Sequence, residues 1–163
     1  MFALAPNSAA STAELLQGLR EQARALLEGE RDPIANAANV ASLIFHALPD
    51  LNWAGFYWMK GGELVLGPFQ GKPACVRIAV GKGVCGTAVR DRRTIVVPDV
   101  EQFPGHIACD SASRSEIVVP VMREGRVLGV LDIDSPSLSR FDEEHAHALE
   151  ALVSDFVQAT DLG

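Results

Sequence analysis

The sequence lacks the features of membrane, secreted and nucleic-acid-binding proteins. No apolar run reaches the roughly 18 residues that a membrane span needs. Residues 1–12 contain no positively charged stretch ahead of an apolar block, so they do not resemble a secretory signal. Lys and Arg number 14 against 21 Asp and Glu, and the net charge of −7 disfavours nucleic acid as a partner. We therefore expect a cytoplasmic protein that binds no nucleic acid and no membrane.

Cysteine is also scarce, because Cys75, Cys85 and Cys109 are the only three in the chain. A domain of this length buries roughly 70% of the surface of its unfolded chain, so it needs neither a disulfide nor a metal to fold. In a reducing cytosol, cysteines do not form a structural disulfide framework. An odd number of cysteines in such a protein indicates reactive thiols, metal binding or no special role.

The length of 163 residues suits one domain. Residues 1–12 are rich in Ala, Ser, Asn and Pro, which predicts a flexible tail ahead of a domain over 13–163. Helical spacing of apolar residues, short strand-like runs and turn residues predict an α+β sandwich with a mostly antiparallel sheet. The expected helices are 13–28 after a Thr12 cap, 33–47 after an Asp32 cap, a short helix over 84–90, and a last helix that Asp142 caps and that ends near 157. The expected strands are 51–59, 63–66, 76–80, 94–97, 115–122 and 126–134.

Two cysteines fall in segments that we expect to be long loops, Cys75 within 67–86 and Cys109 within 98–114. Long loops in compact domains are more often functional than not, and a structural buried cysteine is less expected there. Cys85 begins a short helix and is equally well explained as a small apolar residue of the core. The two loop cysteines are therefore the stronger candidates for chemistry.

His106 lies three residues before Cys109 and allows two interpretations. A thiol attacks as its thiolate, and a nearby histidine would raise the thiolate fraction. A loop histidine that bonds the backbone is the simpler explanation. A zinc site made of His106 with Cys75, Cys85 and Cys109 is a weaker alternative, because the sequence contains no C-x2-4-C pair.

Acidic residues provide the second set of candidates. Asp132 and Asp134 end an apolar strand and share one of its faces, where their mutual repulsion would raise one pKa; a solvated strand end is the simpler interpretation of this pair alone. A two-residue turn at 124–125 would place Glu116 on the opposite face from Asp132. Type I′ turns require positive φ at both positions, where Glu is unfavourable, so we predict a three-residue loop over 123–125. That loop brings Glu116 directly across from Asp132 and gathers three carboxyls in one patch.

A glycine-rich segment, Gly-Lys-Gly-Val-Cys-Gly at 81–86, matches the spacing of dinucleotide-binding loops. The helix predicted after it is too short for a βαβ unit, and a tight turn into that helix explains the glycines. We therefore expect no nucleotide cofactor.

Trp53 and Tyr57 share one face of a predicted strand. Core packing is the ordinary role of such aromatic residues. Sulfur packs well against aromatic rings, so Trp53 would also suit the wall of a pocket for an S-methyl group.

The segments that carry these residues resemble the free methionine-R-sulfoxide reductase family, which is a family of GAF domains. The resemblance runs from about residue 28 to 152, and the contexts of the three cysteines distinguish this family from GAF domains that only sense ligands. The matching segments are 52–57 (Asn-Trp-Ala-Gly-Phe-Tyr), 66–75, 81–88, 97–100, 103–110 (Phe-Pro-Gly-His-Ile-Ala-Cys-Asp), 113–120 and 129–136.

The resemblance implies a single GAF-type domain with N- and C-terminal helices on one face of the sheet and active-site loops on the other. It also implies that Cys109 attacks the sulfoxide sulfur and becomes a sulfenic acid. Cys75 would then form a disulfide with it, with Cys85 as a secondary thiol, and thioredoxin would restore the thiols. No cofactor or metal is implied, and a homodimer is consistent with the family.

The resemblance further assigns the pocket residues. Glu116 and Asp132 would protonate or hold the sulfoxide oxygen, and Asp134 would bind the substrate ammonium. Trp53 and Tyr57 would form the pocket wall. The alternative from another functional class is a GAF domain that senses a small ligand without catalysis.

Overall fold

The computed structural model describes residues 2–4 and 10–163, which form an antiparallel six-stranded sheet with helices. The strand order across the sheet is β3-β2-β1-β6-β5-β4. The strands are β1 (Trp53–Lys60), β2 (Glu63–Gly71), β3 (Arg77–Ala79), β4 (Ile95–Val97), β5 (Ser115–Arg123) and β6 (Arg126–Ser135). The helices are α1 (Thr12–Leu27), α2 (Pro33–Ala47), α3 (Gly83–Asp91) and α4 (Glu143–Ala159), together with the 3-10 turn η1 (Val100–Gln102).

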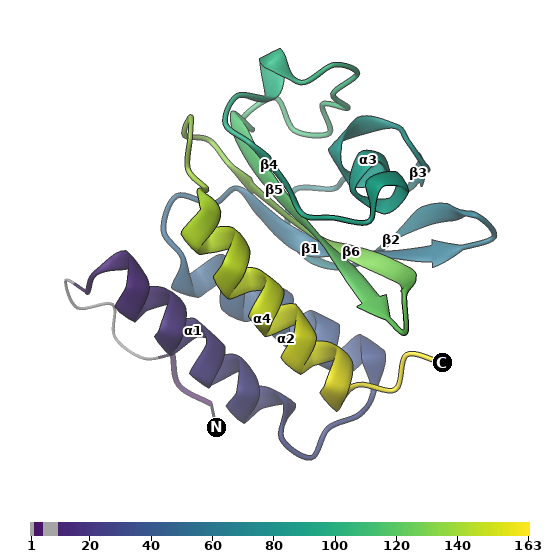
Figure 1. Ribbon diagram of the computed structural model, residues 1–163. Helices are drawn as coiled ribbons and strands as arrows, with labels where there is room; N and C mark the ends of the chain where they lie inside the picture. The colour runs from purple at the N-terminus through teal and green to yellow at the C-terminus, as the bar shows by residue number, and fades with distance from the viewer. Residues whose placement is uncertain (1, 5–9) are drawn as a thin grey trace.

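The sheet separates two layers of different character. Helices α2 and α4 pack on one face, with α1 against these two helices, and α3 lies on the other face together with the long connections (Figure 1). The larger core packs between the three helices and the sheet and includes the fully buried Phe56, Leu131 and Phe156. A smaller core around Tyr57 and Val130 lies under α3. The predicted α+β arrangement is confirmed, and none of the helices described is long and apolar enough to cross a membrane.

Helices α1, α2 and α4 begin at polar caps, as the sequence predicts for the last two, whereas α3 has no side-chain cap. The Asp32 carboxylate accepts hydrogen bonds at the start of α2, and Asp142 caps α4. Helix α1 begins one residue earlier than predicted, because the Ser11 hydroxyl accepts from the Glu14 backbone N–H at 3.2 Å. Residues 1 and 5–9, half of the predicted tail at 1–12, lie outside the described residues.

The turn between β5 and β6 differs from the prediction. It is the two-residue turn Glu124-Gly125, and φ is 50° and 77° at these positions. A turn of this kind matches the right-handed twist of the two strands, which outweighs the unfavourable backbone of Glu124. On its own, this turn would place Glu116 and Asp132 on opposite faces of the sheet.

A β-bulge reverses that consequence. One extra residue of β6, at Leu128, shifts the register of the β5–β6 pair by one position. Glu116 consequently pairs with Asp134, and Asp132 pairs with Val118, so the predicted Glu116–Asp132 register is wrong. Because alternate residues of a strand share a face, the three carboxyls nevertheless point to the same side of the sheet.

Strand β1 lies between β2 and β6 and carries both predicted aromatic residues. Trp53, Gly55 and Tyr57 alternate along it and therefore share the face under α3. A Cβ built on Gly55 would lie 2.8 Å from the Cα of Phe69 and 2.8 Å from the Cη2 of Trp53, closer than real Cβ contacts. Only glycine leaves room there for the indole ring beside its neighbouring strand.

We expect Gly55→Ala to lower the free energy of unfolding by about 2–3 kcal/mol, because the added methyl group forces Trp53 or β2 to move. Gly18→Ala is the matched control. Gly18 lies inside α1 with nothing within 4 Å of an added Cβ, so its replacement should stabilise the protein by about 1 kcal/mol. Urea denaturation of both variants measures the two effects, and a Gly55→Ala protein as stable as the wild type would contradict the prediction.

Candidate active site

A pocket lies on the sheet face that carries α3 and the long connections. Its empty volume is about 540 Å³, which includes the open mouth and lies within the range of small-ligand sites. Cys75 joins the site through its bond to Cys109. The other seven predicted site residues line the pocket, namely Trp53, Tyr57, Cys85, Cys109, Glu116, Asp132 and Asp134.

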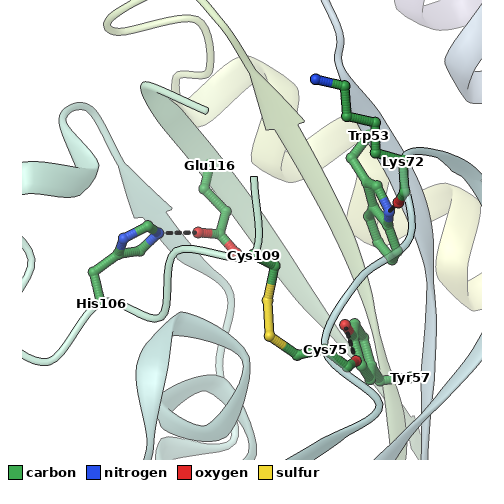
Figure 2. Close-up of a disulfide and its surroundings, with 7 residues drawn as sticks. All are labelled: Trp53, Tyr57, Lys72, Cys75, His106, Cys109 and Glu116. Carbon is green, nitrogen blue, oxygen red and sulfur yellow. Dashed lines mark hydrogen bonds and ion pairs between the residues drawn. A yellow bond between two sulfur atoms is a disulfide. The ribbon is translucent and has the colours of Figure 1, made fainter. Parts of the chain in front are cut away.

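The two loop cysteines form a disulfide at this pocket (Figure 2). Their Cα atoms are 5.8 Å apart, although 34 positions separate them in the sequence. Cys109 is exposed and Cys75 is partly buried, so solvent reaches the bond. A disulfide offers no thiolate to a metal, and the alternative zinc site of three cysteines and His106 is therefore absent among the described residues.

Cys85 is a free, buried thiol in the first turn of α3. Its sulfur and carboxylate oxygens of Glu116 and Asp132 all lie within 4.8 Å of one another. Burial raises the pKa of the Cys85 thiol well above its ordinary value, and the charges of Asp132 and Glu116 raise it further. The helix N-terminus therefore does not make Cys85 a thiolate, and its thiol remains protonated at neutral pH.

The carboxyls of Glu116 and Asp132 are almost completely buried, with 5% and 7% of each residue exposed. Burial raises the pKa of both well above the ordinary range, and the negative charge of Glu116 adds to the shift of Asp132. Asp134 is partly exposed, and its pKa is raised by burial and then by the charge of Asp132. Burial therefore favours the protonated form of Glu116 and Asp132, which suits a proton donor and disfavours the binding of a metal cation.

One oxygen of this carboxyl cluster is left without a partner. Asp132 Oδ1 is fully buried and has no hydrogen bond within the described ranges 2–4 and 10–163. An unpaired buried oxygen is costly, and a ligand that donates a hydrogen bond would satisfy it.

His106 is a site residue for which sequence analysis preferred a simpler role. Its Nε2 lies 3.5 Å from Glu116 Oε2, as Figure 2 shows, while its backbone N–H donates to Phe103 at 3.2 Å. Burial lowers the pKa of the imidazole. The nearness of His106 to Cys109 in the sequence was the only indication that it belongs to the site. No sequence pattern predicts that residue 106 contacts a side chain of β5.

Trp53 and Tyr57 form one wall, as predicted, and both are buried. Their rings stack with centroids 5.9 Å apart, and Trp53 also stacks on Phe69 at 5.2 Å. Each ring donates a hydrogen bond to the chain that carries Cys75. The indole N–H donates to the carbonyl of Lys72 at 3.1 Å, and the Tyr57 hydroxyl donates to the carbonyl of Cys75 at 2.8 Å (Figure 2).

Asn52 and Asp110 hold the segment that carries Cys109, and sequence analysis did not identify either residue. The Asn52 amide donates to Asp110 at 3.1 Å and to Ser113 at 2.9 Å. The Ala112 backbone N–H and the Asn52 amide keep the pKa of the Asp110 carboxyl below its ordinary value. Lys72 Nζ lies 4.0 Å from Asp110 and thereby joins the two cysteine segments electrostatically.

Comparison with known proteins identifies the family. Residues 35–161 match the model of the GAF domain. The chain is 58% identical over 129 residues to Protein YtsP of Bacillus subtilis, covering 78% of this chain and 79% of that protein. It is 50% identical over 141 residues to the free methionine-R-sulfoxide reductase of Escherichia coli, covering 86% of each.

A solved structure gives the same result. The free methionine-R-sulfoxide reductase of Neisseria meningitidis, in complex with its substrate, superposes with a TM-score of 0.93 at 45% identity, covering 98% of this chain and 95% of that one. The structural match extends over nearly the whole chain, and the matched GAF range 35–161 contains all the residues that line the pocket. The chain belongs to the GAF-domain family of free methionine-R-sulfoxide reductases.

Proposed function

We propose that this protein reduces free methionine-R-sulfoxide to methionine with its own cysteines. The observation that carries the proposal is the Cys75–Cys109 disulfide beside a pocket lined by carboxyls and aromatic rings. A disulfide in this position is the expected end product of thiol-dependent sulfoxide reduction. The relatives named as free methionine-R-sulfoxide reductases support the same substrate.

In the first step, the Cys109 thiolate attacks the sulfur of the sulfoxide. Glu116 or Asp132 donates a proton to the sulfoxide oxygen, because that oxygen leaves poorly unless it is protonated. The hydroxyl group passes to Cys109, whose sulfur is oxidised to a sulfenic acid, and the substrate sulfur is reduced to the thioether of methionine. The unpaired Asp132 Oδ1 supports this assignment, since the protonated oxygen would supply its missing hydrogen bond.

In the second step, the Cys75 thiol attacks the sulfur of Cys109. The S–S bond forms as the S–O bond breaks, and the hydroxide leaves as water with the proton of the Cys75 thiol. An external dithiol then reduces the disulfide and closes the cycle, and we propose thioredoxin in this role. Cys85 would be a secondary thiol that becomes reactive only if it leaves its buried, protonated state.

The pocket accounts for a preference for the free amino acid. Asp134 lies at the partly exposed side of the carboxyl cluster and pairs across the sheet with Trp53, where it would bind the substrate ammonium. Trp53 and Tyr57 would contact the S-methyl group, because sulfur packs well against aromatic rings. A peptide-bound methionine has no free ammonium for Asp134. Cytoplasmic localisation and a homodimer remain part of the proposal from the family resemblance.

We expect the protein with dithiothreitol to release methionine from free methionine-R-sulfoxide, and not from the S epimer or a peptide-bound sulfoxide. Cys109→Ser should reduce the activity by at least about a thousandfold, because the attacking thiolate is missing. Without reductant, Cys75→Ser should release one methionine per chain and stop at the sulfenic acid. Chromatographic quantification of methionine measures all three. Absence of methionine from every substrate with fully reduced thiols would contradict the proposal and favour a ligand-sensing GAF domain.

The buried carboxyls also predict how stability depends on pH. An acid whose pKa is higher in the folded protein stabilises the fold fully below its unfolded pKa of about 4, and this contribution is lost as pH rises through the folded value. We therefore expect oxidised Glu116→Gln to melt higher than oxidised wild type at pH 8, by roughly 2–4 °C for each kcal/mol gained. The difference should be smallest near pH 4, because Glu116 is then protonated in the folded protein and about two-thirds protonated in the unfolded chain.

Glu21→Gln is the matched control, since Glu21 is an exposed carboxyl on α1 whose amide replacement can still accept from Gln17. Thermal melts at several pH values between 4 and 8 follow both variants. A Glu116→Gln advantage that is independent of pH, or larger at pH 4, would show that the Glu116 carboxyl is not held protonated by burial.

A further inference from the structure

The segment that carries Cys75 has few ties to the sheet. We call residues 72–76 the Cys75 segment; it leaves the sheet where β2 ends at Gly71 and re-enters where β3 begins at Arg77. At its far end, the Leu66 backbone N–H donates to the carbonyl of Val76 at 2.9 Å. Among residues 2–4 and 10–163, the side chains that donate to the backbone of this segment are Trp53 and Tyr57.

The two ring donors are rigid. Both lie on β1, which is hydrogen-bonded to strands on each side, and their rings stack on each other. The indole N–H can only donate, and burial raises the pKa of the Tyr57 hydroxyl so that it keeps its proton. The segment that carries Cys109 is held by the hydrogen bond from Asn52 to Asp110, and the ion pair of the exposed Lys72 with Asp110 at 4.0 Å links the two segments. Each cysteine therefore reaches the disulfide from its own tether at β1.

We propose that Trp53 and Tyr57 are positioning residues for disulfide formation, because their hydrogen bonds to the carbonyls of Lys72 and Cys75 hold the Cys75 segment within reach of Cys109. This role rests on the order of cysteines in the proposed function and adds to the contact that the rings make with the substrate. The same wall of the pocket thus serves sulfoxide binding in the first step and delivery of the second thiol afterwards.

The tethers act on the rate at which the Cys109 sulfenic acid becomes the disulfide. Without them the Cys75 segment samples more conformations, and its sulfur meets Cys109 less often. A hydrogen bond of ordinary net strength corresponds to a factor of about 2 to 12 in such a rate. The lifetime of the sulfenic acid measures this step directly, whatever a substitution does to substrate binding.

Two conservative variants remove one donor each and keep an aromatic ring, namely Tyr57→Phe and Trp53→Phe. Thr87→Val is the matched control. The Thr87 hydroxyl donates to the carbonyl of Gly83 within α3 at 2.6 Å. Its removal therefore deletes one side-chain hydrogen bond and leaves the bonds to the Cys75 segment in place. Circular dichroism and melting temperature establish that each variant is folded, and the two ring variants test the same step independently.

The experiment mixes each fully reduced protein either with free methionine-R-sulfoxide or with one equivalent of hydrogen peroxide. Peroxide oxidises Cys109 to the sulfenic acid and is itself reduced to water, so this arm does not depend on the substrate pocket. Dimedone added at successive times traps the remaining sulfenic acid, which mass spectrometry then quantifies. We expect the lifetime to be about three- to tenfold longer in each ring variant, longer again in the double variant, and unchanged in Thr87→Val.

Equal lifetimes in wild type and both ring variants would overturn the tethering role. If sulfoxide produces neither sulfenic acid nor the Cys75–Cys109 disulfide while peroxide does, the proposed substrate is wrong, and the peroxide arm still decides the tethering role. If peroxide produces sulfenic acid in the wild type but no Cys75–Cys109 disulfide, Cys75 is not the resolving thiol, and both the cysteine order and the tethering role fail.

Discussion

The burial of three carboxyls on one face of two neighbouring strands is the constraint on which the site depends. Burial removes Glu116 and Asp132 from water and raises the pKa of each carboxyl, which favours its protonated form. Burial also raises the pKa of Asp134, which is more exposed. The thiol of Cys85 is protonated for the same reasons. A cluster of this kind costs stability at neutral pH, and its protonated carboxyls suit the proton donation that the proposed sulfoxide reduction needs.

Strand β1 organises the other half of the site. Asn52, just before it, holds the segment of Cys109, while Trp53 and Tyr57 hold the segment of Cys75. Gly55 lies between the two rings and leaves room for the indole. Two cysteines that are 34 positions apart therefore meet where one segment is bonded to Asn52, just before β1, and the other to the rings of β1. On the opposite face of the sheet, the larger core packs against this strand through the contact of Phe56 with Phe156.

The β5–β6 hairpin illustrates where reasoning from local sequence fails. Gly125 predicts a turn, but the length of the turn depends on whether the backbone of Glu124 adopts a positive φ. The bulge at Leu128 had no signal in the sequence. The shorter turn and the bulge each shift the register of the two strands by one residue, and together they move the partner of Glu116 from Asp132 to Asp134, which lies on the same face. The prediction that the three carboxyls share a face is therefore confirmed, whereas the predicted strand partner of Glu116 is wrong.

The sequence by itself determined the helices that begin at Asp32 and Asp142, the α+β class, and the identity of the reactive side chains, because caps, alternation and residue chemistry are local properties. Only the tertiary structure decided which groups meet. The contact of His106 with Glu116, the link from Asn52 to Asp110 and the bonds from the two rings to the Cys75 segment all join residues that are remote or unrelated along the chain. Such contacts depend on register, bulges and loop closure over many residues, and no local pattern encodes them.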